Sequence, residues 1–136
     1  MRILVTGAKG QLGSDLVKEL EKRGIEAIGV DMQEMDITSA SQCREIIEKE
    51  HNSSALEAVI HCAAYTAVDK AEDEPELVRS VNADGTENIA VICRDLDIKM
   101  LYISTDYVFD GEGTRPWEPD DKRNPLNVYG QMKYEG

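Results

Sequence analysis

The chain has 136 residues, 41% of them hydrophobic, which suits one domain with its own apolar core and leaves no room for two domains of ordinary size. The formal net charge of −12 argues against nucleic acid and anionic membranes as partners, because both demand a basic face. Cys43, Cys62 and Cys93 are too widely spaced for a zinc or redox motif, so we expect three small buried side chains in a reducing compartment. No apolar run has the length of a membrane span, and the first run is too short for a signal peptide, which predicts a cytoplasmic protein.

Short apolar runs alternate with segments of helical period along the chain. Strands are predicted over residues 2–6, 26–30, 58–62 and 99–104. Helices are predicted over residues 11–23, 39–50 and 75–96, the last with a break near 82–85, and again from Asn127 after a long loop over residues 110–127. Gly24 is expected to end the first helix, and Thr38 or Ser39 to cap the second. This alternation predicts the α/β class: a doubly wound, parallel, Rossmann-type sheet with right-handed crossovers and helices on both faces.

The first strand runs directly into a glycine loop, Thr6-Gly7-Ala8-Lys9-Gly10-Gln11-Leu12-Gly13. Glycines at this spacing, between a strand and a helix, permit a tight turn, close approach of a pyrophosphate and close packing of the helix on the sheet. The phosphates would lie beside Gln11, Leu12 and Gly13, where free N–H groups and the helix dipole favour negative charge. Lys9 would add charge near the phosphates or be a solvated lysine, and a purely structural turn is the alternative for the whole loop.

Two acidic residues follow the second strand. Asp31 stands at its end, about 20 residues past the glycine loop, where a carboxylate can bind the ribose hydroxyls of NAD. The nearby stretch has no arginine suited to a 2′-phosphate, which favours NADH. Asp36, followed by Ile37, could reach the adenine amino group or belong to a turn or helix cap, and residue type alone leaves both open.

Small and polar residues follow the third and fourth strands, at the edge where open α/β sheets bind ligands. Ala63, Ala64 and Thr66 would lie against a dinucleotide or simply permit close helix packing. The fourth strand leads into Ser104-Thr105-Asp106-Tyr107, which supplies hydroxyl and carboxylate groups at the same edge.

Tyr129 and Lys133 are four residues apart on the last predicted helix and therefore share a face. Carbonyl reduction needs a proton for the oxygen as hydride reaches the carbon, and a neighbouring ammonium favours the phenolate form of a tyrosine. The Thr105 hydroxyl could hydrogen-bond the same carbonyl. The YxxxK spacing arises often by chance on solvated helices, but together with the glycine loop it indicates a nicotinamide-dependent reductase.

Five segments, TGAKGQLG, AAYTAVDKAE, VNADGT, STDYVFDG and PLNVYGQMK, in this order resemble the dTDP-4-dehydrorhamnose reductases of the extended short-chain dehydrogenase/reductase superfamily. The resemblance covers nearly the whole chain. It implies that Gly7, Gly10 and Gly13 cradle the pyrophosphate, with further cofactor contacts from Asp36, Ile37, Ala63, Ala64 and Thr66. It implies a catalytic set of Thr105, Tyr129 and Lys133, with Tyr129 donating the proton and Lys133 also binding the nicotinamide ribose. Asp106 and Tyr107 would touch the sugar.

The reaction implied by the resemblance is reduction of the 4-keto group of dTDP-4-dehydro-L-rhamnose to dTDP-L-rhamnose, in surface-polysaccharide biosynthesis, with NADPH or NADH as hydride donor. A homodimer and bound Mg²⁺ are implied by the resemblance alone. We interpret Asp110 with Glu112, and Asp120 with Asp121, as solvated loop charges.

Relatives in this family continue beyond the YxxxK motif into further strands and a substrate lobe. We therefore expect residues 1–136 to be an NAD(P)-binding Rossmann domain without the substrate domain. Because short helices are marginal without tertiary support, we expect Lys133 to be frayed, and the isolated chain to bind cofactor with little or no reductase activity.

The sequence departs from the family at two places. Met132 stands where relatives carry Thr or Ser, and His61-Cys62 replaces smaller or amide residues. We interpret His61 and Tyr65 as packing residues. Two other functions remain open: a sugar-nucleotide epimerase or dehydratase, which shares the glycine loop and YxxxK, and a non-catalytic dinucleotide-binding regulatory subunit, like that of methionine adenosyltransferase.

Overall fold

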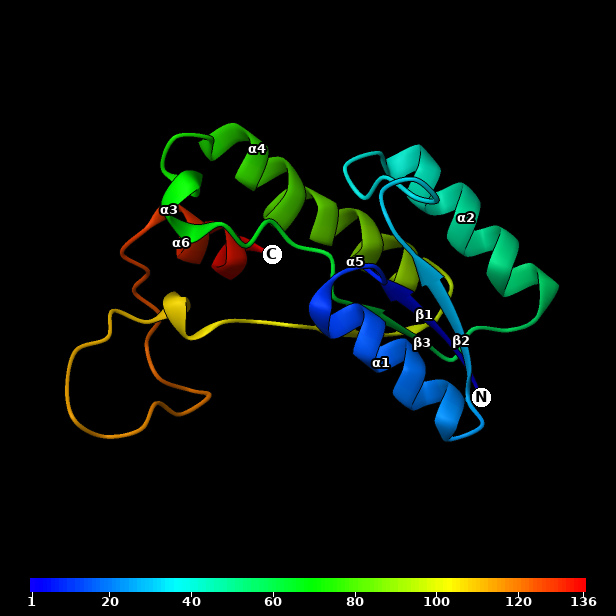
Figure 1. Cartoon of the computed structure of the whole chain (residues 1–136). Coiled ribbons are helices and arrows are strands. Elements are labelled where there is room, and N and C mark those ends of the chain that lie inside the picture. Colours follow the sequence, from blue (N-terminus) through cyan, green and yellow to red (C-terminus); the bar gives the residue numbers. More distant parts are fainter.

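The computed structural model describes all 136 residues and contains one parallel four-stranded sheet in the order β2-β1-β3-β4 (Figure 1). The strands are β1 (Arg2–Thr6), β2 (Glu26–Val30), β3 (Ala58–His61) and β4 (Lys99–Tyr102). The α-helices are α1 (Gln11–Lys22), α2 (Ala40–Ser53), α3 (Val68–Ala71), α4 (Pro75–Arg79), α5 (Gly85–Asp95) and α6 (Val128–Glu135). A π-helical segment, η1 (Ser80–Asp84), joins α4 to α5, and a 3₁₀ turn, η2 (Asp106–Val108), follows β4. The predicted α/β class and parallel sheet are confirmed.

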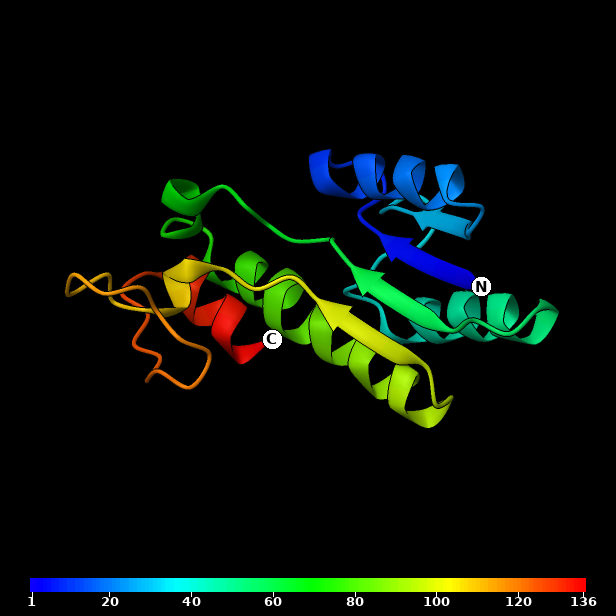
Figure 2. The same cartoon turned by 90° about the horizontal axis from the view of Figure 1, so that it is seen from below.

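Alternate residues of β1 enter two separate cores, one on each face of the sheet. Ile3 and Val5 pack against Leu20 of α1, whereas Leu4 belongs to a larger cluster with residues of α2 and α5, including Ile47 and Ile92. Figure 2 shows the same division, with α1 on one side of the strands and α2 and α5 on the other. The period-two alternation of a strand thus produces the doubly wound arrangement.

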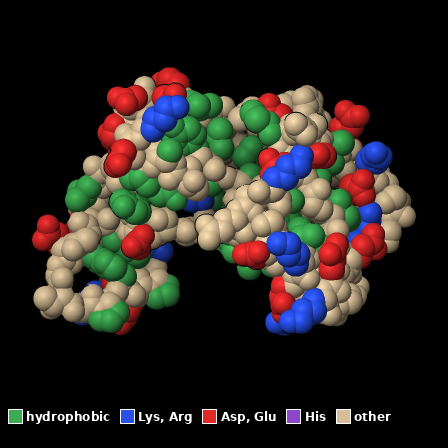
Figure 3. Space-filling view, in the orientation of Figure 1, with side chains coloured by type: hydrophobic (Ala, Val, Ile, Leu, Met, Phe, Trp, Pro, Cys, Tyr) green, Lys and Arg blue, Asp and Glu red, His purple; other side chains and the backbone are tan.

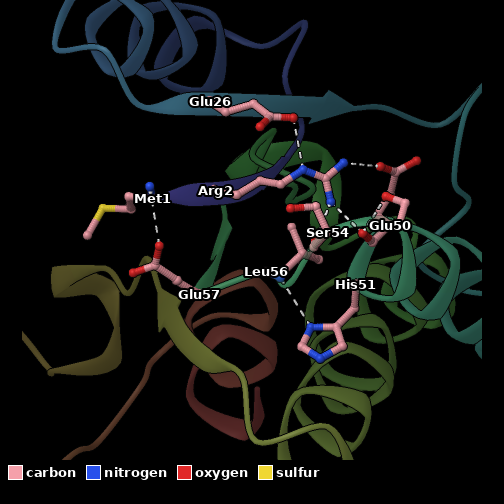
Figure 4. Close-up of polar contacts among 9 residues, drawn as sticks. Met1, Arg2, Glu26, Glu50, His51, Ser54, Leu56 and Glu57 are labelled. Carbon is pink, nitrogen blue, oxygen red and sulfur yellow. Dashed lines mark hydrogen bonds and ion pairs between the residues drawn. The ribbon is translucent and has the colours of Figure 1, made fainter.

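Arg2 fixes the amino-terminal end of β1, the end opposite the glycine loop. Its buried guanidinium donates to the Glu26 carboxylate of β2 at 2.9 Å and to the Glu50 carboxylate of α2 at 2.6 Å (Figure 4). It also donates to the backbone carbonyls of Glu50 and Ser54, where α2 ends. A cation at a helix C-terminus satisfies unpaired carbonyls and opposes the helix dipole. This long-range contact accounts for α2 running to Ser53, beyond the predicted end at residue 50.

Several predicted boundaries need correction. The third strand ends at His61 and the fourth at Tyr102, because the backbone beyond each leaves the ladder for side-chain partners. The Ala63 amide donates to the Thr6 hydroxyl, and the Ile103 carbonyl accepts from Lys133 Nζ. The break predicted near residues 82–85 corresponds to η1, a π-helical turn over residues 80–84 that interrupts the α-helical pattern while the chain stays helical, and the short helix α3 was not predicted. Ser39, not Thr38, caps α2.

Helix α6 is short but anchored at both ends, so the expectation that Lys133 is frayed is wrong. The Asn127 side chain accepts from the Gly130 amide at 2.7 Å, and the Glu72 carboxylate accepts from the Val128 amide at 2.8 Å. At the other end Glu135 pairs with Arg79 of α4 at 2.9 Å. Acceptors at a helix N-terminus satisfy its free N–H groups, so neighbouring elements supply the support that an isolated eight-residue helix lacks. No helix of the chain is both long enough and apolar enough to cross a bilayer.

Candidate functional site

A cleft opens at the carboxyl ends of β1, β2 and β3, where β1 gives way to the glycine loop. It consists of two adjoining hollows that share Gly7, Gly10, Cys62 and Ala64. The first hollow extends over the ends of β2 and α4, and the second extends past α1 to α6. Figure 3 shows the surface hollowed between the part that carries the loop over residues 110–127 and the part that carries α1. All thirteen sequence-predicted cofactor residues line this cleft: Gly7, Gly10, Gln11, Leu12, Gly13, Asp31, Asp36, Ile37, Ala63, Ala64, Thr66, Tyr129 and Lys133.

The glycine loop forms the shared floor, and backbone contacts leave no room for side chains at two of its positions. Gly7 has φ +65°, and a Cβ there would lie 2.7 Å from the Ala63 nitrogen. A Cβ on Gly13 would lie 2.1 Å from the Gly7 carbonyl oxygen. Helix α1 begins after Gly10 with no side-chain cap, and Gln11, Leu12 and Gly13 of its first turn line the second hollow. An uncapped helix N-terminus facing a cleft is suited to an anion such as a pyrophosphate.

The first hollow combines two carboxylates with an apolar wall. Asp31 accepts from the Lys9 amide at 2.8 Å and from the Met32 amide at 2.9 Å, which fixes its carboxylate at the end of β2. Asp36 accepts from both the amide and the hydroxyl of Thr38, at 2.9 and 2.8 Å. The turn interpretation of Asp36 is therefore correct, and the same residue lines the hollow beside Ile37.

Lys9 matches the solvated role considered for it, because its side chain is 58% exposed. Its ammonium pairs with Glu34 at 2.9 Å, and this ion pair lowers the pKa of the Glu34 carboxyl. Glu34 in turn accepts from the Asp31 amide at 3.0 Å. The loop lysine is thus an exposed side chain that pairs with Glu34 beside the end of β2, and the residue also lines the first hollow.

The second hollow ends at the tyrosine–lysine pair on α6. Both side chains are buried, with Tyr129 9% and Lys133 4% exposed. Lys133 Nζ donates to the Ile103 carbonyl at 2.6 Å and lies 4.1 Å from the centre of the Tyr102 ring. Burial lowers the pKa of Lys133 to about 8, so the amine remains mostly an ammonium at neutral pH. An ammonium with one fixed acceptor keeps further N–H groups for a ligand in the cleft.

The other residues predicted for catalysis and substrate do not line either hollow. The Thr105 hydroxyl donates to Asp106 at 3.2 Å and accepts from the Tyr107 amide at 3.3 Å, which begins the turn η2. Ile103 and Ser104 line the hollow instead. Tyr107 contacts the site through its ring, which meets the Tyr129 ring edge-on with centroids 5.7 Å apart. The roles of Thr105, Asp106 and Tyr107 remain predictions.

Some lining residues were not predicted from the sequence. Cys62 was expected to be buried like Cys43 and Cys93, but it is only half-buried and lines both hollows. The apolar wall of the first hollow includes Met32, Met35, Leu77 and Val81, which come from two distant segments of the chain. Hydrophobicity alone marks such residues as core, and only the fold brings them to the cleft.

Two of the four loop carboxylates considered for Mg²⁺, Asp110 and Asp121, have protein partners. Asp110 accepts from the Glu112 amide and from the Asn124 side chain, and Asp121 pairs with Arg115 at 2.5 Å. Nowhere in the chain are three or more His, Cys, Asp or Glu side chains grouped to hold a metal ion.

Comparison with known proteins gives consistent matches. The RmlD substrate binding domain family matches residues 1–136. A dTDP-4-dehydrorhamnose reductase of Streptomyces griseus is 42% identical over 135 residues, which are 99% of this chain and 43% of that protein. A Bacillus anthracis dTDP-4-dehydrorhamnose reductase, solved in complex with NADP, is 39% identical with a TM-score of 0.93 over 98% of this chain and 46% of that one. A Brucella ovis UDP-glucose 4-epimerase, solved with NAD, is 25% identical with a TM-score of 0.86, over 98% of this chain and 44% of that one. The chain therefore spans less than half the length of these proteins.

Proposed function

This chain belongs to the RmlD substrate binding domain family, and we propose that its cleft binds a nicotinamide dinucleotide for the reduction of dTDP-4-dehydro-L-rhamnose to dTDP-L-rhamnose. One observation carries the proposal. A single cleft joins an uncapped helix N-terminus, reached over glycines that cannot bear side chains, to a buried tyrosine–lysine pair. The helix N-terminus suits a pyrophosphate, and the tyrosine–lysine pair suits proton donation to a carbonyl beside the nicotinamide.

In this proposal each part of the cleft takes one part of the cofactor. The first turn of α1 binds the pyrophosphate, and the Asp31 carboxylate accepts hydrogen bonds from the adenine ribose. The adenine lies in the apolar first hollow near Ile37. The nicotinamide end lies in the second hollow near Ala64 and Thr66, toward α6.

The chemistry assigned to the chain is proton donation and positioning. When bound, the reduced nicotinamide supplies the hydride that reaches the carbonyl carbon. Tyr129 gives its hydroxyl proton to the carbonyl oxygen, which completes the alcohol and leaves a phenolate. The Lys133 ammonium binds a ribose hydroxyl and stabilises that phenolate, and its Ile103 partner fixes its direction. The Thr105 hydroxyl donates to the substrate oxygen after leaving Asp106.

Two observations bear on which nicotinamide cofactor the cleft would bind. Asp31 supports NADH, because its carboxylate would repel a 2′-phosphate, whereas NADPH is supported by the likeness to the protein solved with NADP. We place the chain in the cytoplasm with a dTDP-sugar as substrate, and sedimentation tests whether it forms a homodimer.

Titration of the chain with NADH and NADPH, followed by calorimetry, tests the cofactor half of the proposal. Saturable binding should be lost in a Gly10→Glu variant, whose carboxylate would occupy the phosphate position. Asn52→Glu adds the same charge on exposed α2, away from the cleft, and should bind like the wild type. Loss of binding in both variants, or in neither, would contradict the assignment of the glycine loop.

An epimerase remains the second candidate, because the Brucella ovis UDP-glucose 4-epimerase shares the fold at 25% identity. The fate of the cofactor separates the two. A reductase consumes reduced cofactor in proportion to product from dTDP-4-dehydro-L-rhamnose, whereas an epimerase returns its cofactor unchanged after each turnover.

A further inference from the structure

A buried histidine at the end of β3 links the glycine loop to the lysine of α6 through polar and ring contacts. His61 is 1% exposed, yet both ring nitrogens have partners: the Thr6 hydroxyl lies 2.7 Å from Nδ1, and the Thr86 hydroxyl lies 3.3 Å from Nε2. Its ring stacks on Tyr102 with centroids 5.9 Å apart and planes 20° from parallel. Neither the glycine loop nor the tyrosine–lysine pair requires a histidine here, so the contacts need their own explanation.

The hydrogen-bond partners determine which nitrogen of His61 carries the proton. The Thr86 hydroxyl gives its one proton to the Asn82 carbonyl at 2.8 Å, so its oxygen must accept from Nε2–H. Nδ1 is then bare and accepts from the Thr6 hydroxyl, whose oxygen accepts from the Ala63 amide at 3.1 Å. The result is one directed chain of hydrogen bonds, from Ala63 through Thr6, His61 and Thr86 to Asn82.

A second proton on His61 would break this chain. Nδ1–H would face the Thr6 hydroxyl proton, and the hydroxyl would have to turn away while its oxygen still accepts from Ala63. Burial, and to a lesser degree the positive charge of Lys133, lowers the pKa of His61 to about 4. The imidazole is therefore neutral at physiological pH, with one defined tautomer.

Both ends of the chain reach the cleft. The Ala63 amide belongs to the wall that meets Gly7, and Asn82 clamps the next part of that wall by bonding both the amide and the carbonyl of Tyr65, at 2.8 and 3.0 Å. On its other side the ring that stacks on His61, Tyr102, supports the Lys133 ammonium and donates to the Lys133 carbonyl at 3.1 Å. The His61 side chain is thus connected to both sides of the cleft: through the Thr6 hydroxyl to the Ala63 backbone, and through the Tyr102 ring to Lys133.

We propose that His61, as the neutral Nε2–H tautomer, is a positioning residue that fixes the Ala63 wall and the Tyr102 platform of Lys133 relative to each other. The inference rests on the proposed binding of a nicotinamide dinucleotide in the cleft. His61 touches neither cofactor nor substrate and acts through Thr6, Thr86 and Tyr102. Without His61, the sheet would still form, but the Ala63 backbone and the Tyr102 ring would no longer be held in fixed positions relative to each other.

Imidazole ¹⁵N NMR of the chain tests the tautomer directly, without any ligand. We expect a bare Nδ1 and a protonated Nε2 that do not change from about pH 8 to about pH 5. Titration of His61 within that range, or the opposite tautomer, would overturn the proposal.

Three variants test positioning. His61→Leu removes both hydrogen bonds, and we expect faster exchange of the Ala63 amide and about tenfold weaker dinucleotide binding. His61→Asn retains an acceptor near the Nδ1 position, so it should restore the protection of Ala63 and most of the affinity. Ile92→Val trims the core beneath α5, and a comparable loss of thermal stability there should leave binding unchanged. Unaltered Ala63 exchange and affinity in His61→Leu, or losses that follow thermal stability in all three variants, would refute positioning.

The design also separates this inference from the proposed function. If the wild-type chain binds neither NADH nor NADPH, the cofactor proposal fails. The tautomer and the exchange of Ala63 then still support or overturn the part of the inference that concerns the wall.

Discussion

Gly7→Ala tests most directly the close approach between the glycine loop and the end of β3. The alanine would adopt the left-handed backbone of Gly7, φ +65°, at a cost of about 1 to 2 kcal/mol. Its Cβ would also lie 2.7 and 2.8 Å from the nitrogen and Cα of Ala63, which are backbone atoms and cannot rotate away. Overpacking of this kind costs about 1 to 3 kcal/mol, so we expect a total loss of about 2 to 5 kcal/mol.

Gly24→Ala is the matched control, because Gly24 has φ +71° but an added Cβ would meet nothing within 4 Å. It should therefore lose only about 1 to 2 kcal/mol. Urea unfolding followed by circular dichroism measures both losses, and dinucleotide titration should show weaker binding in Gly7→Ala alone. Equal losses of stability in the two variants would refute the reasoning, since the contact with Ala63 would then contribute nothing.

Three further predictions concern residues that line or support the cleft. His61, with its pKa lowered from 6.5 to about 4, binds a proton more readily in the unfolded chain, so stability present above pH 6.5 should fall by about 3 kcal/mol toward pH 4. Between pH 6.5 and pH 4, the urea midpoint of the His61→Leu variant should therefore fall less than that of the wild type. A thiol reagent should label half-buried Cys62 before Cys43 and Cys93, whose burial raises their pKa to about 11, and bound dinucleotide should slow that labelling in mass spectra. Asn127→Ala removes the cap of α6 and should cost about 1 kcal/mol in urea unfolding, with weaker dinucleotide binding through a displaced Lys133; unchanged stability would contradict the capping role.

The regular elements around the cleft could be predicted because each has a strong local signal. β1 and β2 begin and end at the predicted residues, since branched apolar runs are bounded there by polar or glycine-rich turns. The glycine loop and Asp31 also follow local chemistry, because a strand, a turn and a helix start are contiguous in sequence. The same holds for Tyr129 and Lys133, which helical spacing alone places on one face.

The features that could not be predicted from the sequence depend on contacts between residues far apart in the chain. The π-helical turn η1 places Asn82 where it bonds the backbone of Tyr65, and no local pattern in residues 80–84 signals that partner. The end of α2 depends on Arg2, and the anchoring of α6 depends on Glu72 and Arg79. His61 could be predicted as buried, but its tautomer follows only from the two threonines that the fold brings to it.

The cleft also resolves an apparent conflict between a net charge of −12 and an anionic ligand. The one lysine in the glycine loop is neutralised by Glu34, so it offers the phosphates little free charge. What faces them in the first turn of α1 is backbone, with neither a side-chain cap nor an acidic residue, and the Asp15 carboxylate lines the hollow one turn further along. Helix dipoles act within about one turn, whereas the repulsion of dispersed surface carboxylates is screened over about 10 Å at moderate salt. Binding of phosphate to this chain therefore depends on the local geometry that Gly7 and Gly13 permit, and net charge is a poor guide to its ligand.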